Sequence, residues 1–75
     1  MNLYNVKLNT ICKVCNINVQ NEKTKIRLME LGLVEGVAIY VKNKSLLKKT
    51  LLVVFNNSCF TIKENIAQEI EVKYV

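Results

Sequence analysis

Apolar and polar residues alternate over short stretches along much of the chain, which is the pattern of half-buried β-strands. This alternation is clearest in Val37–Lys42 (VAIYVK) and Ile70–Tyr74 (IEVKY). Two further strand-like stretches, Leu51–Phe55 and Ser58–Ile62, are separated only by Asn56-Asn57. Because asparagine tolerates positive φ at both positions of a two-residue turn, these two stretches predict a β-hairpin.

A longer strand is predicted over Thr10–Val19 (TICKVCNINV), but its apolar positions change parity midway. Cys12 and Val14 would lie on one face, whereas Cys15, Ile17 and Val19 would lie on the other. A β-bulge between Val14 and Cys15 would bring both sets inward. The pattern therefore predicts a curved strand with a bulge near its middle.

The residues before this strand, Leu3–Leu8, form a short lead-in to it. Leu3, Val6 and Leu8 are its expected apolar anchors. Asn9 is expected to turn the chain, because asparagine enters the left-handed region more readily than most residues.

One helix is predicted between the first two strands, over about Glu22–Leu31, with Asn21 as its N-cap. On a helical wheel the polar residues Lys23, Arg27 and Glu30 fall together as a ridge. The rest of the arc is mainly apolar, so we expect the helix to pack on the sheet through a wide apolar face. The residues of that face are Ile26, Leu28, Met29 and Leu31.

Both glycines of the chain, Gly32 and Gly36, follow this helix within the run RLMELGLVEG. Gly32 stands where a left-handed residue ends a helix, in a Schellman closure that folds Leu33 back toward Leu28. Gly36 fits the third position of a type II turn over Val34–Val37, which requires positive φ. The two turns predict a structural role for Gly32, Leu33 and Gly36, with Leu33 pressed into the core.

These elements sum to about five short strands with one short helix after the first strand, and strands this short bury their apolar faces best in a small barrel. Lys63–Gln68 (KENIAQ) adds one helical turn before the last strand. We therefore predict a mainly β fold, an SH3-like small barrel, in which residues 1–75 form a single domain.

Composition narrows the function, because the chain contains no histidine and no aspartate. A Ser-His-Asp triad and any histidine-based metal site or general base are therefore impossible. No glycine-rich phosphate loop is present either. These absences predict a protein that is not an enzyme and that binds no cofactor.

The three cysteines include a C-x-x-C pair, Cys12 and Cys15, together with Cys59. In a strand, positions i and i+3 point to opposite faces, so buried packing is favoured over a metal or redox site. An odd number of cysteines also argues against a disulfide framework. The N-terminus lacks a secretory signal, and the longest apolar run, Leu51–Phe55, is too short to cross a bilayer. We therefore expect a cytoplasmic protein without direct membrane insertion.

The net charge of +5 comes mostly from one segment, Lys42–Lys49 (KNKSLLKK), which holds four lysines and no acid. Leu46 and Leu47 stand between the lysines. They could form an exposed apolar patch with a basic rim formed by Lys44, Lys48 and Lys49, which suits an acidic protein partner. Alternatively, the two leucines cap one end of the barrel, or the segment is only a solvated loop.

Two other cations, Lys23 and Arg27, are secondary candidates for contact with a phosphate or carboxylate. The alternative is a solvated helix ridge in which Glu30 is a local partner. Nucleic-acid binding is the main rival function, since the chain is basic. However, binding of single strands relies on clustered exposed aromatic residues, and here the aromatics are scattered. A nucleic-acid partner is therefore not expected.

The run RLMELGLVEG resembles the signature of the FeoA family, an Arg-Leu-x-x-Leu-Gly-Leu segment followed two residues later by glycine. The end of the chain, FTIKENIAQEIEV, is similar to the family's closing pattern, with Ala67, Ile70 and Val72 at matching positions. The resemblance implies a small cytoplasmic SH3-like barrel that acts as an accessory component of bacterial ferrous-iron uptake.

The partner that this resemblance implies is FeoB, a membrane transporter with a cytoplasmic GTP-binding domain. The implied partner favours contact through Leu46, Leu47 and the neighbouring lysines. Because the same barrel also occurs as a domain of iron-dependent repressors, a stand-alone relative of that domain is an alternative. A homo-oligomer is compatible with the sequence.

Overall fold

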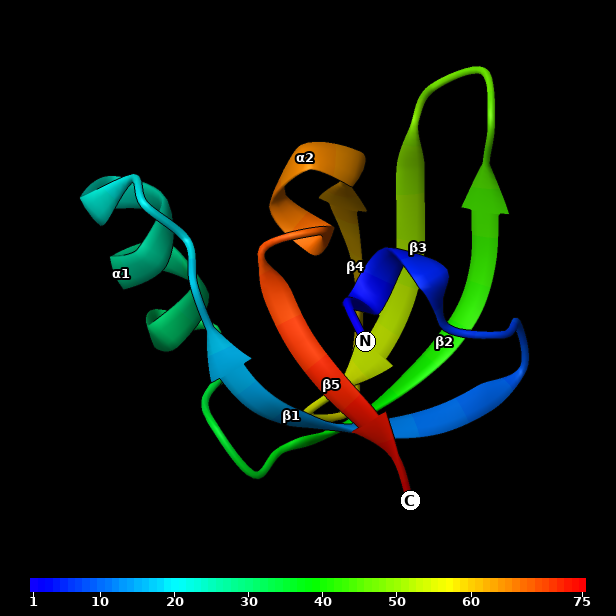
Figure 1. The fold of residues 1–75 in the computed structure, drawn as a ribbon, viewed down its shortest axis with the longest axis horizontal. Helices are drawn as coiled ribbons and strands as arrows, with labels where there is room; N and C mark the ends of the chain where they lie inside the picture. Colours follow the sequence, from blue (N-terminus) through cyan, green and yellow to red (C-terminus); the bar gives the residue numbers. More distant parts are fainter.

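The computed structural model describes residues 1–75 as one antiparallel five-stranded sheet, with strand order β4-β3-β2-β1-β5. The sheet curls strongly, and α1 stands to one side of it (Figure 1). The mainly β architecture, with one helix after the first strand, is confirmed. In chain order the elements are η1 (Leu3–Asn5), β1 (Thr10–Ile17), α1 (Glu22–Glu30), β2 (Ala38–Ser45), β3 (Thr50–Phe55), β4 (Ser58–Lys63), α2 (Glu64–Ala67) and β5 (Ile70–Tyr74).

The core consists of the apolar side chains that alternate along the strands, and no polar residue is buried with them. β3 shows this most regularly, since Leu51, Val53 and Phe55 are buried and the residues between them are half-exposed. Burial of each such side chain contributes about 1.5–3 kcal/mol relative to leaving it in water. Because LLVVF is apolar throughout, the sequence locates this strand but does not show which of its faces is inside.

The lead-in anchors the N-terminus to the core as predicted at Leu3 and Val6, which are 0% and 2% exposed. The prediction for Leu8 was wrong, because this side chain is 44% exposed. Leu8 lies in the tight turn that precedes β1, where the neighbouring Asn9 has φ 62°. A residue at the outside of such a turn points away from the sheet.

The bulge in β1 is confirmed: the register of β1 against β5 shifts between Val14 and Asn16. Cys12 and Val14 face the core. Cys15 was predicted to face inward as well, and this was wrong, because it is exposed. Cys15 is the extra residue of the bulge, without a partner on β5, and the bulge turns its side chain to solvent.

The exit from α1 has the predicted Schellman geometry. The Leu33 amide donates to the Leu28 carbonyl at 2.9 Å, and the Gly32 amide donates to the Met29 carbonyl at 3.0 Å. Gly32 has φ +98° and Leu33 is fully buried. At the following turn Gly36 has φ +91°, and the Val37 amide donates to the Val34 carbonyl. Both glycine turns are therefore confirmed.

The β2–β3 hairpin extends further than its sequence suggests. β2 was expected to end at Lys42, but it continues to Ser45, and the turn is confined to Leu46–Lys49. A second bulge makes this extension possible, since the register against β3 shifts between Val41 and Asn43. Asn43–Ser45 are held in the strand by backbone pairing with β3 and not by burial of their side chains. Backbone pairing alone produces no apolar–polar alternation, so the sequence did not predict this part of the strand.

The two edge strands of the sheet differ in how they are covered. The N-terminal residues lie along β5, where Asn2 pairs with Glu71 and the Val72 amide donates to the Met1 carbonyl at 2.8 Å. β4 pairs with β3 only. One edge of the curled sheet is therefore closed, whereas the other remains open.

Candidate functional site

The tip of the β2–β3 hairpin exposes two leucines, with Leu46 at 77% and Leu47 at 98% of their full exposure. The alternative in which they cap one end of the barrel is therefore wrong. Lys48 and Lys49 are also exposed, and the Lys48 amide donates to the Ser45 hydroxyl across the turn. We call Leu46, Leu47, Lys48 and Lys49 the hairpin tip.

Lys44 does not share this exposure, although it is close to the tip in sequence. Its ammonium donates to the Tyr4 carbonyl oxygen at 2.7 Å and lies 4.2 Å from the centroid of the Tyr4 ring. A charge-assisted hydrogen bond and a cation–π contact together fix η1 against β2. Lys44 therefore has a structural role, joining β2 to η1, and is not part of the basic surface around the hairpin tip.

A shallow cationic hollow of about 330 Å³ lies at the base of the tip. Lys48 and Lys49 reach it from the tip, and Lys63 reaches it from the end of β4. The Glu64 amide donates to the Lys49 carbonyl at 2.8 Å, which fixes the hairpin against α2. Basic side chains thus extend the positive surface from the tip toward β4, with Glu64 as the one carboxylate.

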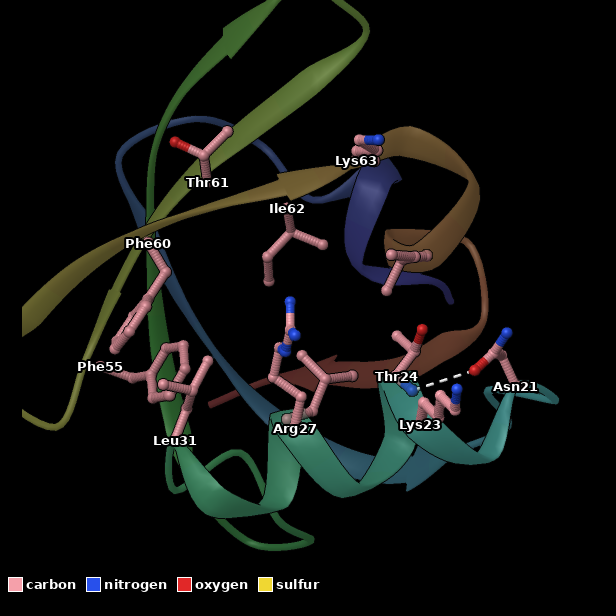
Figure 2. A pocket seen from close by; sticks show the side chains of 12 residues that line it. Asn21, Lys23, Thr24, Arg27, Leu31, Phe55, Phe60, Thr61, Ile62 and Lys63 are labelled. Carbon is pink, nitrogen blue, oxygen red and sulfur yellow. Dashed lines mark hydrogen bonds between the residues drawn. The ribbon is translucent and has the colours of Figure 1, made fainter.

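A larger groove of about 520 Å³ separates α1 from β4 (Figure 2). Its floor is apolar, and Phe55 and Phe60 stack within it at 4.5 Å between ring centroids. Three cations and no carboxylate line it. The apolar lining residues are Leu28, Leu31, Phe55, Phe60, Ile62 and Ile66, and the cations are Lys23, Arg27 and Lys63.

This groove corrects the predicted orientation of α1. Lys23 and Arg27 line the groove rather than forming a ridge away from the sheet. Ile26 and Met29, which were expected to pack on the sheet, are each 52% exposed, and only Leu28 of the helix is buried. A helical wheel shows which residues share a face of the helix. Which face turns inward depends on the element that packs opposite, and a wheel does not show that element.

The cysteines do not come together as a ligand set. Cys12 is buried, and this burial, with a smaller effect of the neighbouring Cys15, raises the pKa of its thiol to about 11. Cys15 and Cys59 are exposed. No three histidine, cysteine, aspartate or glutamate side chains are placed to hold a metal ion. Cys12 therefore acts as a small apolar core residue.

The groove could not be predicted from the sequence, because its lining comes from segments that are far apart along the chain. Phe60 and Ile62 belong to β4, Ile66 to α2, and Arg27 to α1. The only sign of the groove in the sequence was the pair of cations Lys23 and Arg27, one helical turn apart. The same pair is equally compatible with a solvent-exposed polar ridge on the helix. None of the helices is long and apolar enough to span a membrane.

Comparison with known proteins gives a match to the model of the FeoA domain over residues 1–74. No match was found among curated protein sequences. The solution structure of a FeoA protein from Chlorobium tepidum is 28% identical, with a TM-score of 0.91, and the match covers 100% of this chain and 70% of that chain.

Two other structures place the fold more broadly. Stenotrophomonas maltophilia FeoA complexed with zinc is described as a prokaryotic SH3 domain protein, which confirms the predicted SH3-like barrel. It is 26% identical, with a TM-score of 0.82, and the match covers 97% of this chain and 89% of that one. IdeR of T. acidophilum, at 19% identity and a TM-score of 0.85, shares the fold over 100% of this chain and 34% of its own. Because the FeoA domain model matches residues 1–74 and the fold is the same small barrel, the chain belongs to the FeoA family.

Proposed function

We propose that this protein is a cytoplasmic accessory component of bacterial ferrous-iron uptake, and that it binds the cytoplasmic GTP-binding region of a FeoB-type transporter. Membership of the FeoA family supports the role in iron uptake. The S. maltophilia relative is itself described as a candidate activating factor of ferrous iron transport. A binding role, rather than an enzymatic one, agrees with a chain that lacks histidine and aspartate.

The observation that carries this proposal is the exposure of the hairpin tip. Leu47 is almost fully exposed at the end of the β2–β3 hairpin, which projects from the barrel. Isolated exposed leucines are common, but two adjacent ones beside Lys48 and Lys49 form an apolar centre with a charged rim. Apolar contact would supply affinity, whereas the lysines would steer the approach to an acidic surface.

The test is a binding measurement between the full chain and the purified cytoplasmic domain of the transporter. The double variant Leu46→Asp, Leu47→Asp is expected to weaken binding at least about tenfold, since it puts charges in the apolar centre of the contact. It should fold normally, because neither side chain is packed against the barrel.

Leu8→Asp is the matched control, because Leu8 is also an exposed leucine but lies outside the tip. It should leave binding within about twofold of the unchanged chain. Undiminished binding by a folded double variant would show that the tip is not the contact. A transporter domain that fails to bind the unchanged chain would reject the partner as well.

A further inference from the structure

We propose that the groove between α1 and β4 binds an extended acidic peptide segment, which pairs with the open edge of β4 and places apolar side chains in the groove. This inference concerns a second surface and does not depend on contact through the hairpin tip. Strand addition to an exposed sheet edge is a general mode of peptide recognition, in which main-chain hydrogen bonds give affinity and side-chain pockets give specificity.

The first observation is the uncovered edge of β4. In an antiparallel pair, the backbone groups of successive residues point alternately toward and away from the partner strand. Phe55 and Ser58 close the two-residue turn, so the pairing register directs the backbone of Phe60 toward β3. The backbone groups of Cys59 and Thr61 then point to the open side, and none of them makes another backbone hydrogen bond.

An open edge is a hazard for aggregation that proteins usually cover. This chain covers its other edge, β5, with the N-terminal residues Met1 and Asn2. No segment does the same for β4, although that edge borders the groove between α1 and β4. The contrast between the two edges indicates that β4 is left available for a partner.

The second observation is the direction of the side chains on β4. In Figure 2, Phe60 and Ile62 point toward α1, whereas Thr61 points the opposite way. Paired residues of neighbouring strands share a face of the sheet. Every second side chain of an added strand would therefore enter the groove beside Phe60 and Ile62, where Leu28 and Leu31 form the opposite apolar wall.

The third observation is the charge of the groove. Lys23 and Arg27 line it from α1, Lys63 lines it from β4, and no carboxylate balances them. Figure 2 shows the Arg27 guanidinium raised from α1 toward Ile62, within the groove. A cationic lining with an apolar floor suits a segment that carries both acidic and apolar residues, and it disfavours a basic one.

The probe for this proposal is the capped heptapeptide Val-Thr-Glu-Thr-Val-Thr-Glu, whose valines and glutamates share the groove face, titrated into the isotopically labelled full chain and followed by NMR. We expect backbone amide shifts in β4 and α1, centred on Cys59, Thr61 and the groove face of the helix. A peptide in which lysine replaces every glutamate should not bind. N-methylation of the central threonine should weaken binding, because that residue faces away from the groove and its amide would donate to β4.

The matched variants are Arg27→Glu and Lys42→Glu, which change the net charge equally. Arg27→Glu should reduce the affinity for the peptide about tenfold, which corresponds to about 1.4 kcal/mol. Lys42 is exposed on β2 outside the groove, so Lys42→Glu should change affinity by less than about twofold.

Three results would overturn the proposal. One is the absence of shifts at about 1 mM peptide, a concentration at which even a weak complex would be half formed. Another is equal binding of the peptide in which lysine replaces every glutamate. The third is a set of shifts centred on the hairpin tip rather than on β4.

Discussion

At the residue scale, Gly32 meets two demands at once. Its φ of +98° suits glycine, because a side chain in this region is strained. A Cβ atom at this position would also lie 3.2 Å from the Asn56 side-chain nitrogen. That amide donates to the Leu31 carbonyl and joins the end of α1 to the β3–β4 turn. Gly36, at φ +91°, has open space around it.

The first prediction compares these two glycines. Gly36→Ala should lower the free energy of unfolding by about 1 kcal/mol, which is the cost of placing alanine in the left-handed region. Gly32→Ala should cost more, about 2 kcal/mol, because Asn56 must also move. Denaturant unfolding of the two variants measures the difference. An equal or larger loss for Gly36→Ala would show that the contact with Asn56 carries no cost.

At the element scale, α1 is a helix held by its ends and by one buried side chain. The Asn21 side chain accepts from the Thr24 amide at 3.1 Å, and the Schellman closure fixes the other end. Between these ends only Leu28 is buried. The rest of the inward face lines the groove, so α1 depends on few apolar contacts.

The second prediction follows from this single anchor. Leu28→Ala should lower the free energy of unfolding by about 2–4 kcal/mol and speed amide exchange in α1. Ile26→Ala and Met29→Ala are matched controls on the exposed face of the same helix, and each should cost less than about 0.5 kcal/mol. A large loss for either control would show that the outer face of α1 is covered in solution.

At the scale of the whole molecule, the positive charge divides between two surfaces. One is the hairpin tip with its cationic base, and the other is the groove. Phe55 and Phe60 stack on each other in the groove floor, where Phe55 is 3% exposed and Phe60 is half-buried. Tyr74, at 44%, is the only exposed aromatic side chain, so the molecule has steering charge without a cluster of exposed aromatic rings.

The third prediction concerns the consequence of this charge for partner choice. Binding to the transporter domain should weaken when salt is raised from about 0.05 to about 0.3 M, but only modestly, since apolar contact supplies part of the affinity. Duplex DNA should not bind measurably at about 0.15 M salt. Fluorescence anisotropy with both partners in the same salt series measures this. Tighter binding to DNA than to the transporter domain would favour the nucleic-acid function.

The charge on the lysines was visible in the sequence, but their separate tasks were not. Lys44, Lys48 and Lys49 belong to one basic segment and look equivalent there. In the fold, Lys44 binds Tyr4, forty residues away along the chain, whereas Lys48 and Lys49 remain exposed. A local pattern carries no information on which distant group comes within hydrogen-bonding reach.

The sequence by itself determined most of the turns and most of the strands, the β2–β3 turn with Lys49 at φ 52° being the exception. Asn9, Gly32, Gly36, Asn56 and Asn57 all have positive φ where their residue types predicted it. Alternation located β5 and part of β2, the Asn56-Asn57 turn located β3 and β4, and the change of parity located the bulge in β1. These features depend on the sterics of each residue and its immediate neighbours, which the sequence states directly.

Only the tertiary structure decided which faces turn inward and what they meet. It turned Cys15 and Ile26 to solvent, brought Arg27 into a groove beside Ile62, and left the edge of β4 open while covering that of β5. Burial and charge contact depend on the element that lies opposite, and that element is distant in sequence. The candidate surfaces of this FeoA protein are therefore products of packing between segments that, taken singly, show no sign of them.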